Sequence, residues 1–331
     1  MKADAYGLGA TVVAPALAAE GCRDFFVASL DEGVSVRDAL AAAYPDARVF
    51  VMSGLSRGSA ADYAGLGLVP VLLSPEEVAA WTAIAAVRGP LPAGIKIDTG
   101  MSRLGMEEAA FLDLVASGRL GAFPVALVMS HLACADTPDH PLNADQQARF
   151  AALTRHLPQA RASLANSAGI FLGPAFHFDV ARPGGALYGL APLAHGLNPM
   201  RQVVQLKAKI LQLRDVDSNR AVGYGATRRT DRPSRLATVA IGYADGFLRS
   251  LSNLGAGYVG DTRVALAGRV SMDLTTFDVT DAPPQACRQG DFIDLVCAHQ
   301  SLDDLGRAAG TIGYEVLTRL ARRIDRVYVG G

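Results

Sequence analysis

Residues 69–98 have the sequence VPVLLSPEEVAAWTAIAAVRGPLPAGIKID, and this stretch decides the fold. Two short apolar runs, VPVLL (69–73) and GIKID (94–98), flank an amphipathic segment at 75–87. Ser74-Pro75-Glu76-Glu77 has the pattern of a capping box with proline at the first helical position, which predicts that a helix begins there. A strand, a helix and a second strand in this order predict a parallel pair, because a parallel return needs a crossover connection.

The same alternation extends over the first half of the chain. Seven apolar runs predict strands: FFVAS (25–29), RVFVM (48–52), VPVLL (69–73), GIKID (94–98), VALVMSH (125–131), ASLAN (162–166) and HFDVAR (177–182). Helical segments lie between them, including one at 143–157. A closed (β/α)8 barrel of the TIM type needs eight strands. Residues 11–21 have the pattern of the helix of a preceding unit, so the first strand, missing from this sequence, would end at Lys2.

The position of Lys2 raises the question of where the protein begins. We expect Met1 to be an internal residue of a longer protein whose start was wrongly chosen. The alternatives are a genuinely short protein with reduced activity and an inactive product. A barrel without one strand would expose two edges of unpaired backbone groups and would aim Lys2 poorly.

After about residue 200 the pattern changes to alternating apolar and polar residues. It is visible in LKAKILQLRDV (206–216), RLATVAIGY (235–243), RVALAGRV (263–270), LTTFDV (274–279) and DFIDLV (291–296). Period-two alternation separated by Gly, Asp and Pro turns predicts a mostly antiparallel β domain. The sequence therefore predicts an α/β barrel domain over residues 1–199 and a C-terminal β domain over residues 200–331.

Composition excludes several classes of protein. The net charge of −1 gives no general attraction to nucleic acid or to acidic membranes. The four cysteines have no paired spacing, which argues against a disulfide framework or a zinc ribbon and favours a reduced, cytoplasmic environment. No run approaches the ~18 apolar residues of a membrane span. We expect a soluble protein with no metal site.

Polar residues follow the predicted strands, at the end where barrel enzymes carry their active sites. They are Lys2, Lys96, Asp98, Arg103, His131, Asn166, Ser167 and Arg182. Singly, each has an ordinary structural explanation, but together they predict a mouth that binds anions and contains at least one amine. Arg182 precedes PGGALYG (183–189), and glycines after the last strand allow backbone N–H groups to approach a phosphate. An amine beside a phosphate site favours pyridoxal phosphate held as a lysine Schiff base.

Nine motifs together resemble the alanine racemase family over essentially the whole chain. They are KADAYGLG (2–9), KIDTGMSRLGM (96–106), SHLACAD (130–136), NSAG (166–169), ARPGGALYG (181–189), VGYGAT (222–227), AIGYADGF (240–247), GRVSMD (268–273) and TIGYEVLTRL (311–320). The resemblance implies a pyridoxal-phosphate barrel with a C-terminal β domain. It also implies a head-to-tail homodimer whose active sites take residues from both chains.

The resemblance implies two catalytic bases. Lys2 matches the lysine that holds the cofactor and removes the α-proton of D-alanine. Tyr243, from the partner subunit, matches the base that removes the α-proton of L-alanine from the opposite face. His131 and Arg182 match a hydrogen-bonded chain that keeps the tyrosine reactive, since an unperturbed tyrosine titrates near pH ~10. Arg182 would also face the pyridine nitrogen and leave it unprotonated, because a guanidinium does not give up its proton.

Further residues match binding positions of the family. Tyr6 and Ser167, with the backbone of Gly184 and Gly185, match phosphate contacts. Arg103 and the backbone of Met272 match contacts to the substrate carboxylate, and Lys96 matches a lysine that is often carbamylated. The chain departs from the family at Leu320-Ala321-Arg322-Arg323, where a tyrosine commonly lies near the phosphate and the path by which substrate enters.

The function implied is interconversion of L- and D-alanine, supplying D-alanine for peptidoglycan or degrading it. Because the substrate path differs, a racemase that accepts serine or larger amino acids is an alternative. A second alternative is a pyridoxal-phosphate-binding protein whose activity is impaired by the missing strand. A pyridoxal-phosphate carrier protein would resemble only the first half of the chain, and the predicted β domain argues against this alternative. A decarboxylase of the same barrel type is also disfavoured, because it would place a carboxylate, and not Arg182, against the ring nitrogen.

Overall fold

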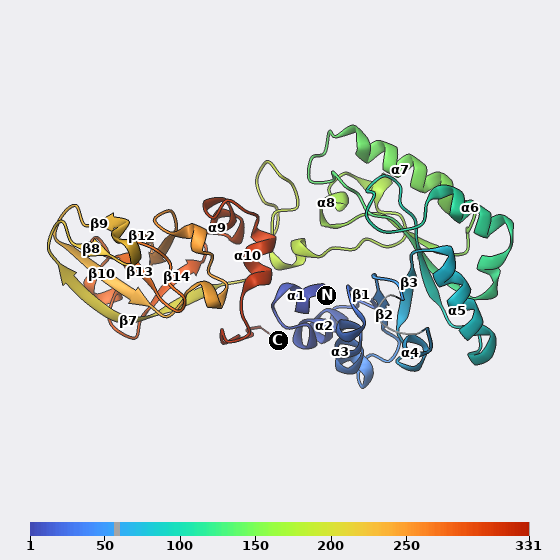
Figure 1. Cartoon of the computed structure of the whole chain (residues 1–331), viewed down its shortest axis with the longest axis horizontal. Coiled ribbons are helices and arrows are strands. Elements are labelled where there is room, and N and C mark those ends of the chain that lie inside the picture. The colour runs from blue at the N-terminus through green and yellow to red at the C-terminus, as the bar shows by residue number, and fades with distance from the viewer. Residues whose placement is uncertain (56–59, 331) are drawn as a thin grey trace. The chain divides into compact units, whose positions relative to one another are not determined.

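The computed structural model describes residues 1–55 and 60–330 of the 331-residue chain (Figure 1). The chain forms two compact units. The first comprises Met1–Leu187 and Ala191–Asn198, and the second comprises Tyr188–Leu190 and Pro199–Gly330. Among the residues described, no helix has the length and apolar character needed to cross a membrane.

The first unit contains one parallel sheet with the strand order β1-β2-β3-β4-β5-β6. Its strands are β1 (Asp24–Val27), β2 (Arg48–Val51), β3 (Val69–Leu72), β4 (Ala93–Lys96), β5 (Val125–Met129) and β6 (Arg161–Ser163). Each strand pairs in parallel with the next in the sequence. The predicted alternation of parallel strands and helices is thus confirmed.

Helices lie before, between and after these strands. They are α1 (Lys2–Tyr6), α2 (Ala10–Ala19), α3 (Leu30–Ala41), α4 (Ala60–Gly65), α5 (Pro75–Arg88), α6 (Glu108–Ala116), α7 (Pro141–Thr154) and α8 (Ser167–Ile170). As predicted, α5 begins at Pro75, and the Ser74 hydroxyl accepts the Glu77 N–H at 3.3 Å. In a full capping box the Glu77 carboxylate would accept the N–H of Ser74. Here it accepts the N–H of the preceding residue, Leu73, at 2.8 Å.

The prediction of a seventh regular strand at 177–182 was wrong. The segment runs beside β6, but it makes only an isolated parallel bridge between Asn166 and Arg182. Phe178 has a left-handed φ of 50°, and the N–H groups of Asp179 and Val180 both donate to the carbonyl of Ala162. Two donors on one carbonyl interrupt the ladder of a regular strand. The described sheet is therefore six-stranded, with an irregular segment along β6.

The second unit is built on a closed antiparallel barrel with the strand order β10-β13-β12-β11-β14-β7, which confirms the predicted β domain. The strands are β7 (Leu206–Val216), β10 (Ser234–Val239), β11 (Ala256–Val259), β12 (Thr262–Leu266), β13 (Thr275–Asp278) and β14 (Phe292–Val296). Helices α9 (Leu302–Ala308) and α10 (Gly313–Arg319) follow the last strand and pack against each other.

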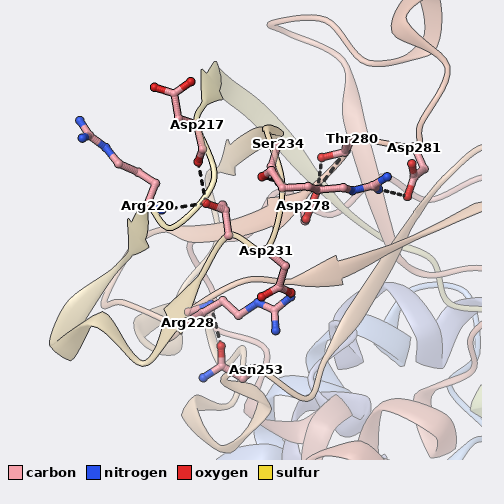
Figure 2. A network of polar contacts seen from close by, with 12 residues as sticks. Asp217, Arg220, Arg228, Asp231, Ser234, Asn253, Asp278, Thr280 and Asp281 are labelled. Atoms are coloured by element: carbon pink, nitrogen blue, oxygen red, sulfur yellow. Dashed lines mark hydrogen bonds and ion pairs between the residues drawn. The ribbon is translucent and has the colours of Figure 1, made fainter.

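A small hairpin of β8 (Ala221–Val222) and β9 (Arg228–Arg229) is attached to the barrel through side chains. The buried Thr230 hydroxyl donates to the carbonyl of Asp217 at 2.7 Å and accepts the N–H of Arg220 at 2.8 Å. Figure 2 shows this polar network, including Asn253 beside the hairpin. The side chain of Asn253 donates to the hydroxyl of Thr227 at 3.1 Å.

Candidate active site

The first unit gathers positive charge at the carboxyl ends of its strands. Lys96 ends β4, His131 follows β5, and Arg182 ends the irregular segment beside β6. The charges of Lys2 and Arg103 act on both Lys96 and His131, so these side chains lie in one electrostatic environment. The structure therefore brings together the five predicted basic residues of the mouth.

Arg182 is held by the neighbouring strand ends. Its guanidinium donates to the hydroxyl of Ser163 and to the carbonyls of Ser130 (2.6 Å) and Leu164 (3.3 Å). A longer contact of 3.4 Å joins it to Nδ1 of His131. Burial of the guanidinium lowers the pKa of Arg182 to about 10, so it remains charged at neutral pH.

His131 is kept neutral by its surroundings. Burial, reinforced by the charges of Arg182 and Lys96, lowers the pKa of His131 to about 3. A guanidinium can only donate, so Nδ1 accepts from Arg182 and the single ring proton lies on Nε2. The imidazole therefore offers its Nε2–H group as a hydrogen-bond donor on the side of the ring away from Arg182.

Lys96 is buried and carries an unusually acidic ammonium group. Burial and the charges of Arg103 and Arg182 lower the pKa of Lys96 to about 8, against 10.5 for an ordinary lysine. Near neutral pH a larger share of this amine is therefore neutral than in an ordinary lysine.

The loop after β4 is organised by Asp98. Its carboxylate accepts the N–H groups of Gly100 (2.8 Å), Met101 (2.8 Å) and Arg103 (3.2 Å). Burial alone would raise the pKa of Asp98, but these backbone hydrogen bonds lower it below its usual value. The anchored loop leaves the side chain of Arg103 exposed, so this arginine is available to a bound carboxylate.

Lys2 begins a strained left-handed turn. Ala3, Asp4, Ala5 and Tyr6 all have φ between 52° and 59°, a conformation that costs about 1–2 kcal/mol for each non-glycine residue. Glu32 of α3 stabilises the turn by accepting the N–H of Ala3 at 2.6 Å.

The sheet edge fixes the place of Lys2. The amine of Met1 donates to the carbonyl of Phe26 in β1 at 3.0 Å, which sets Lys2 directly beside the sheet. Ala5 and Tyr6 are buried, which anchors the other end of the turn. The backbone around Lys2 is therefore tied down on both sides.

Tyr6, Ser167 and Gly184 form a cradle at the start of α8. The Ser167 hydroxyl accepts the N–H groups of Gly184 at 2.9 Å and Ala186 at 3.3 Å. A Cβ at position 184 would lie 2.3 Å from the Tyr6 hydroxyl, so only glycine fits without displacing the tyrosine. The hydroxyls of Tyr6 and Ser167 suit the donor requirements of a phosphate, and backbone N–H groups converge on the same point. These residues fit the phosphate of the predicted cofactor.

The second unit places Tyr243 on a tight turn, η5 (Tyr243–Asp245). The turn is bonded to the loop 271–273: Tyr243 N–H donates to Ser271 at 3.0 Å, and Ala244 N–H donates to Met272 at 2.9 Å. A Cβ at position 242 would lie 2.2 Å from the Met272 carbonyl, so a glycine is required there. Tyr243 is 43% exposed and Met272 55% exposed, so both are presented at the surface of this unit.

A cavity of about 350 Å³ adjoins the tyrosine. It is lined by Tyr243, Gly246, Leu248, Arg249 and Arg319. It leaves space beside the phenol for another molecule or chain segment.

Two residues that shape the site, Gln146 and Ser163, were missed by sequence reasoning. Buried Gln146 of α7 donates to the carbonyl of His131 at 2.9 Å and accepts the N–H of Ala133 at 2.9 Å. No pattern distinguishes Gln146 within its helix. Ser163 is different, because a hydroxyl inside the apolar run 162–166 was a signal that something polar faces it.

Comparison with known proteins finds the same family in both parts of the chain. Residues 1–192 match the family model "Alanine racemase, N-terminal domain", and residues 203–328 match "Alanine racemase, C-terminal domain". The alanine racemase of Rhodospirillum rubrum is 52% identical over 100% of this chain and 88% of its own length. That of Rhizobium meliloti is 46% identical over 100% of this chain and 89% of its own length.

Solved structures give the same result. The alanine racemase from Bartonella henselae, which carries covalently bound pyridoxal phosphate, has a TM-score of 0.92 and 37% identity, covering 99% of this chain and 91% of the other. The biosynthetic alanine racemase from Pseudomonas aeruginosa has a TM-score of 0.89 and 38% identity over the same shares.

Proposed function

The chain belongs to the alanine racemase family, and we propose that it interconverts L-alanine and D-alanine with pyridoxal phosphate as cofactor. The observation that carries the proposal is the convergence of Lys2, His131 and Arg182 on one mouth of the first unit. The phosphate cradle of Tyr6, Ser167 and Gly184 supports it.

Lys2 is the residue that would hold the cofactor covalently. Tyr6, Ser167 and the backbone of Gly184 and Gly185 would hold its phosphate. When bound, pyridoxal phosphate supplies an electron sink that acidifies the α-proton of an attached amino acid. Everything else that racemisation requires must come from the side chains and backbone of the protein.

Racemisation needs a base on each face of the α-carbon. We assign Lys2 to the face from which D-alanine loses its proton, and Tyr243 of the partner subunit to the face of L-alanine. Each group takes a proton in one direction and returns one in the other. The neutral His131, with Arg182 behind it, would donate from Nε2 toward the tyrosine and stabilise its deprotonated form.

Arg182 has a second role in this proposal. We assign it to the pyridine nitrogen of the cofactor. With a pKa of about 10 it keeps its proton at neutral pH and would leave the ring nitrogen unprotonated. The weaker electron sink that results disfavours side reactions such as transamination.

Substrate recognition would rest on the carboxylate of the amino acid. We assign Arg103 and the backbone of Met272 to this group. The exposed side chain of Arg103, on a loop anchored by Asp98, supports the assignment.

Lys96 is proposed as a site of carbamylation. A neutral amine reacts with CO2, forming an N–C bond and releasing one proton. The resulting anion would reduce the repulsion among Lys2, Arg103 and Arg182 and help to position Arg103. Because the pKa is about 8, carbamate formation is expected to rise between pH 7 and 9. With ¹³C-bicarbonate, a carbamate carbon signal should appear by NMR and be absent from Lys96→Met. An identical signal in that variant would contradict the assignment.

Gly184→Ala tests the phosphate cradle. The added Cβ would displace the Tyr6 hydroxyl, so the dissociation constant of pyridoxal phosphate is expected to rise about tenfold to a hundredfold. Titration followed by absorbance measures it. Gly121→Ala is the matched control, because nothing lies within 4 Å of a Cβ at that position. Equal affinity in the parent chain and in Gly184→Ala would argue against the cradle.

The setting of the enzyme is also part of the proposal. We propose a head-to-tail homodimer, because the tyrosine of one subunit would serve the lysine of the other, and a cytoplasmic location. D-alanine for peptidoglycan would be the product used by the cell. We also retain the division into a cofactor domain, residues 1–199, and a β domain, residues 200–331, as a proposal.

A direct assay tests the function. The purified chain, loaded with pyridoxal phosphate, is incubated with L-alanine and separately with L-serine, and both enantiomers are measured by chiral chromatography. We expect equal amounts of L- and D-alanine at equilibrium, and slower conversion of serine. Faster conversion of serine would favour the racemase of broader range, and no conversion of either would refute the proposal.

A further inference from the structure

Arg323 connects two carboxylates that belong to separate parts of the Tyr243 site. Its Nε donates to Asp245 at 2.5 Å, and its Nη2 donates to Asp273 at 2.7 Å. Asp245 closes the turn that begins at Tyr243, and Asp273 directly follows Met272. The arginine is 78 residues from the first partner and 50 from the second along the chain.

Asp245 is already committed to the shape of the turn. Its second carboxylate oxygen accepts the N–H of Gly242 at 2.8 Å, and its carbonyl accepts the N–H of Ala321 at 3.0 Å. Asp245 is only 8% exposed, so its charge needs a close partner. Arg323 supplies that partner while its other nitrogen reaches the loop of Met272.

The result is a clamp across the turn and the loop. Backbone bonds from Tyr243 to Ser271 and from Ala244 to Met272 already join the two segments. The guanidinium fixes the outer ends of the same segments, because its planar fork holds two acceptors in set directions. Lysine carries its donors on one nitrogen at the end of a flexible stem, so it would hold the two carboxylates less rigidly.

We propose that Arg323 is a positioning residue for racemisation, holding the Tyr243 turn against the Met272 loop so that the phenol oxygen stays in reach of the α-carbon. This inference rests on the proposed function. Arg323 acts through Asp245 and Asp273 and does not itself contact substrate. A displacement of about 1 Å can cost roughly a hundredfold in rate, so a loosened turn is expected to slow the step that uses the tyrosine.

The test compares Arg323→Ala and Arg323→Lys with the parent chain. Arg232→Ala is the matched control, because Arg232 makes a 2.5 Å ion pair with Asp281 in the same unit. We expect Arg323→Ala to lower kcat/KM for alanine about tenfold to a hundredfold. The two enantiomers have equal energy, so kcat/KM must fall equally in both directions. Arg323→Lys should recover part of the loss, and Arg232→Ala should match the parent chain.

Isotope effects identify which base is affected. In Arg323→Ala, the deuterium isotope effect on kcat/KM measured with α-deuterated L-alanine should be larger than in the parent chain, because proton removal by the tyrosine becomes slower. The isotope effect measured with α-deuterated D-alanine should be smaller, because proton removal by Lys2 no longer limits the rate. A lower amount of folded protein would scale both rates and leave both isotope effects unchanged.

Hydrogen exchange gives a second readout that does not depend on activity. The peptide spanning residues 240–247 should exchange faster in Arg323→Ala than in the parent chain and the control. This inference alone would be overturned if the parent chain racemises alanine and Arg323→Ala has the same isotope effects and exchange rates as the parent chain. A parent chain that does not racemise alanine would overturn the proposed function, and this inference with it.

Discussion

Lys2→Ala is expected to abolish the visible absorbance of lysine-bound pyridoxal phosphate and to reduce racemisation by about 10⁴-fold or more. The amine is both the attachment point of the cofactor and one of the two proposed bases, and loss of a positioned base alone costs roughly 10²–10⁴. The absorbance spectrum with added cofactor and the rate of D-alanine formation measure the two effects separately.

Lys207→Ala provides the comparison. Lys207 is an exposed lysine of the second unit that pairs with Asp294 at 3.5 Å, so its loss removes a surface charge. The spectrum and the rate should stay at the level of the parent chain. If Lys2→Ala retained the absorbance band, another lysine would hold the cofactor and the assignment of Lys2 would be wrong.

Tyr243→Phe is expected to lower kcat by roughly 10²–10⁴ while the protein stays folded. The substitution removes only a hydroxyl from a side chain that is 43% exposed, so little packing is lost. Tyr224→Phe is the matched control, because Tyr224 is 71% exposed in the same unit and has no assigned role. Initial rates from both enantiomers measure the effect.

If Lys2 and Tyr243 are the two bases, Tyr243→Phe should affect α-proton exchange of the two enantiomers differently. In D2O, Tyr243→Phe should still exchange the α-proton of D-alanine, because Lys2 remains on that face. L-alanine should exchange much more slowly. Proton NMR of the α-position follows both reactions. Equal exchange of the two enantiomers would show that the tyrosine is not the base for L-alanine.

Much of the fold could be predicted because its signals are local. A period-two pattern predicts a strand and a helical pattern predicts a crossover, whatever lies elsewhere in the chain. Strand ends in a parallel sheet meet at one edge, so Lys96, His131 and Arg182 could be placed together before any coordinates were known. The segment at 177–182 was wrongly assigned because a single left-handed residue, Phe178, interrupts a run of ordinary strand composition.

The sequence by itself determined the kinds of chemical group in the site and the order in which the strands present them. Only the tertiary structure decided that His131 is neutral and that Lys96 is weakly basic. It also decided that Arg323 bridges two carboxylates that are far from it along the chain. The physical reason is that desolvation and Coulomb energies depend on distance in space. Lys2, Lys96, Arg103 and Arg182 come from separate segments, and only folding sums their charges at one imidazole.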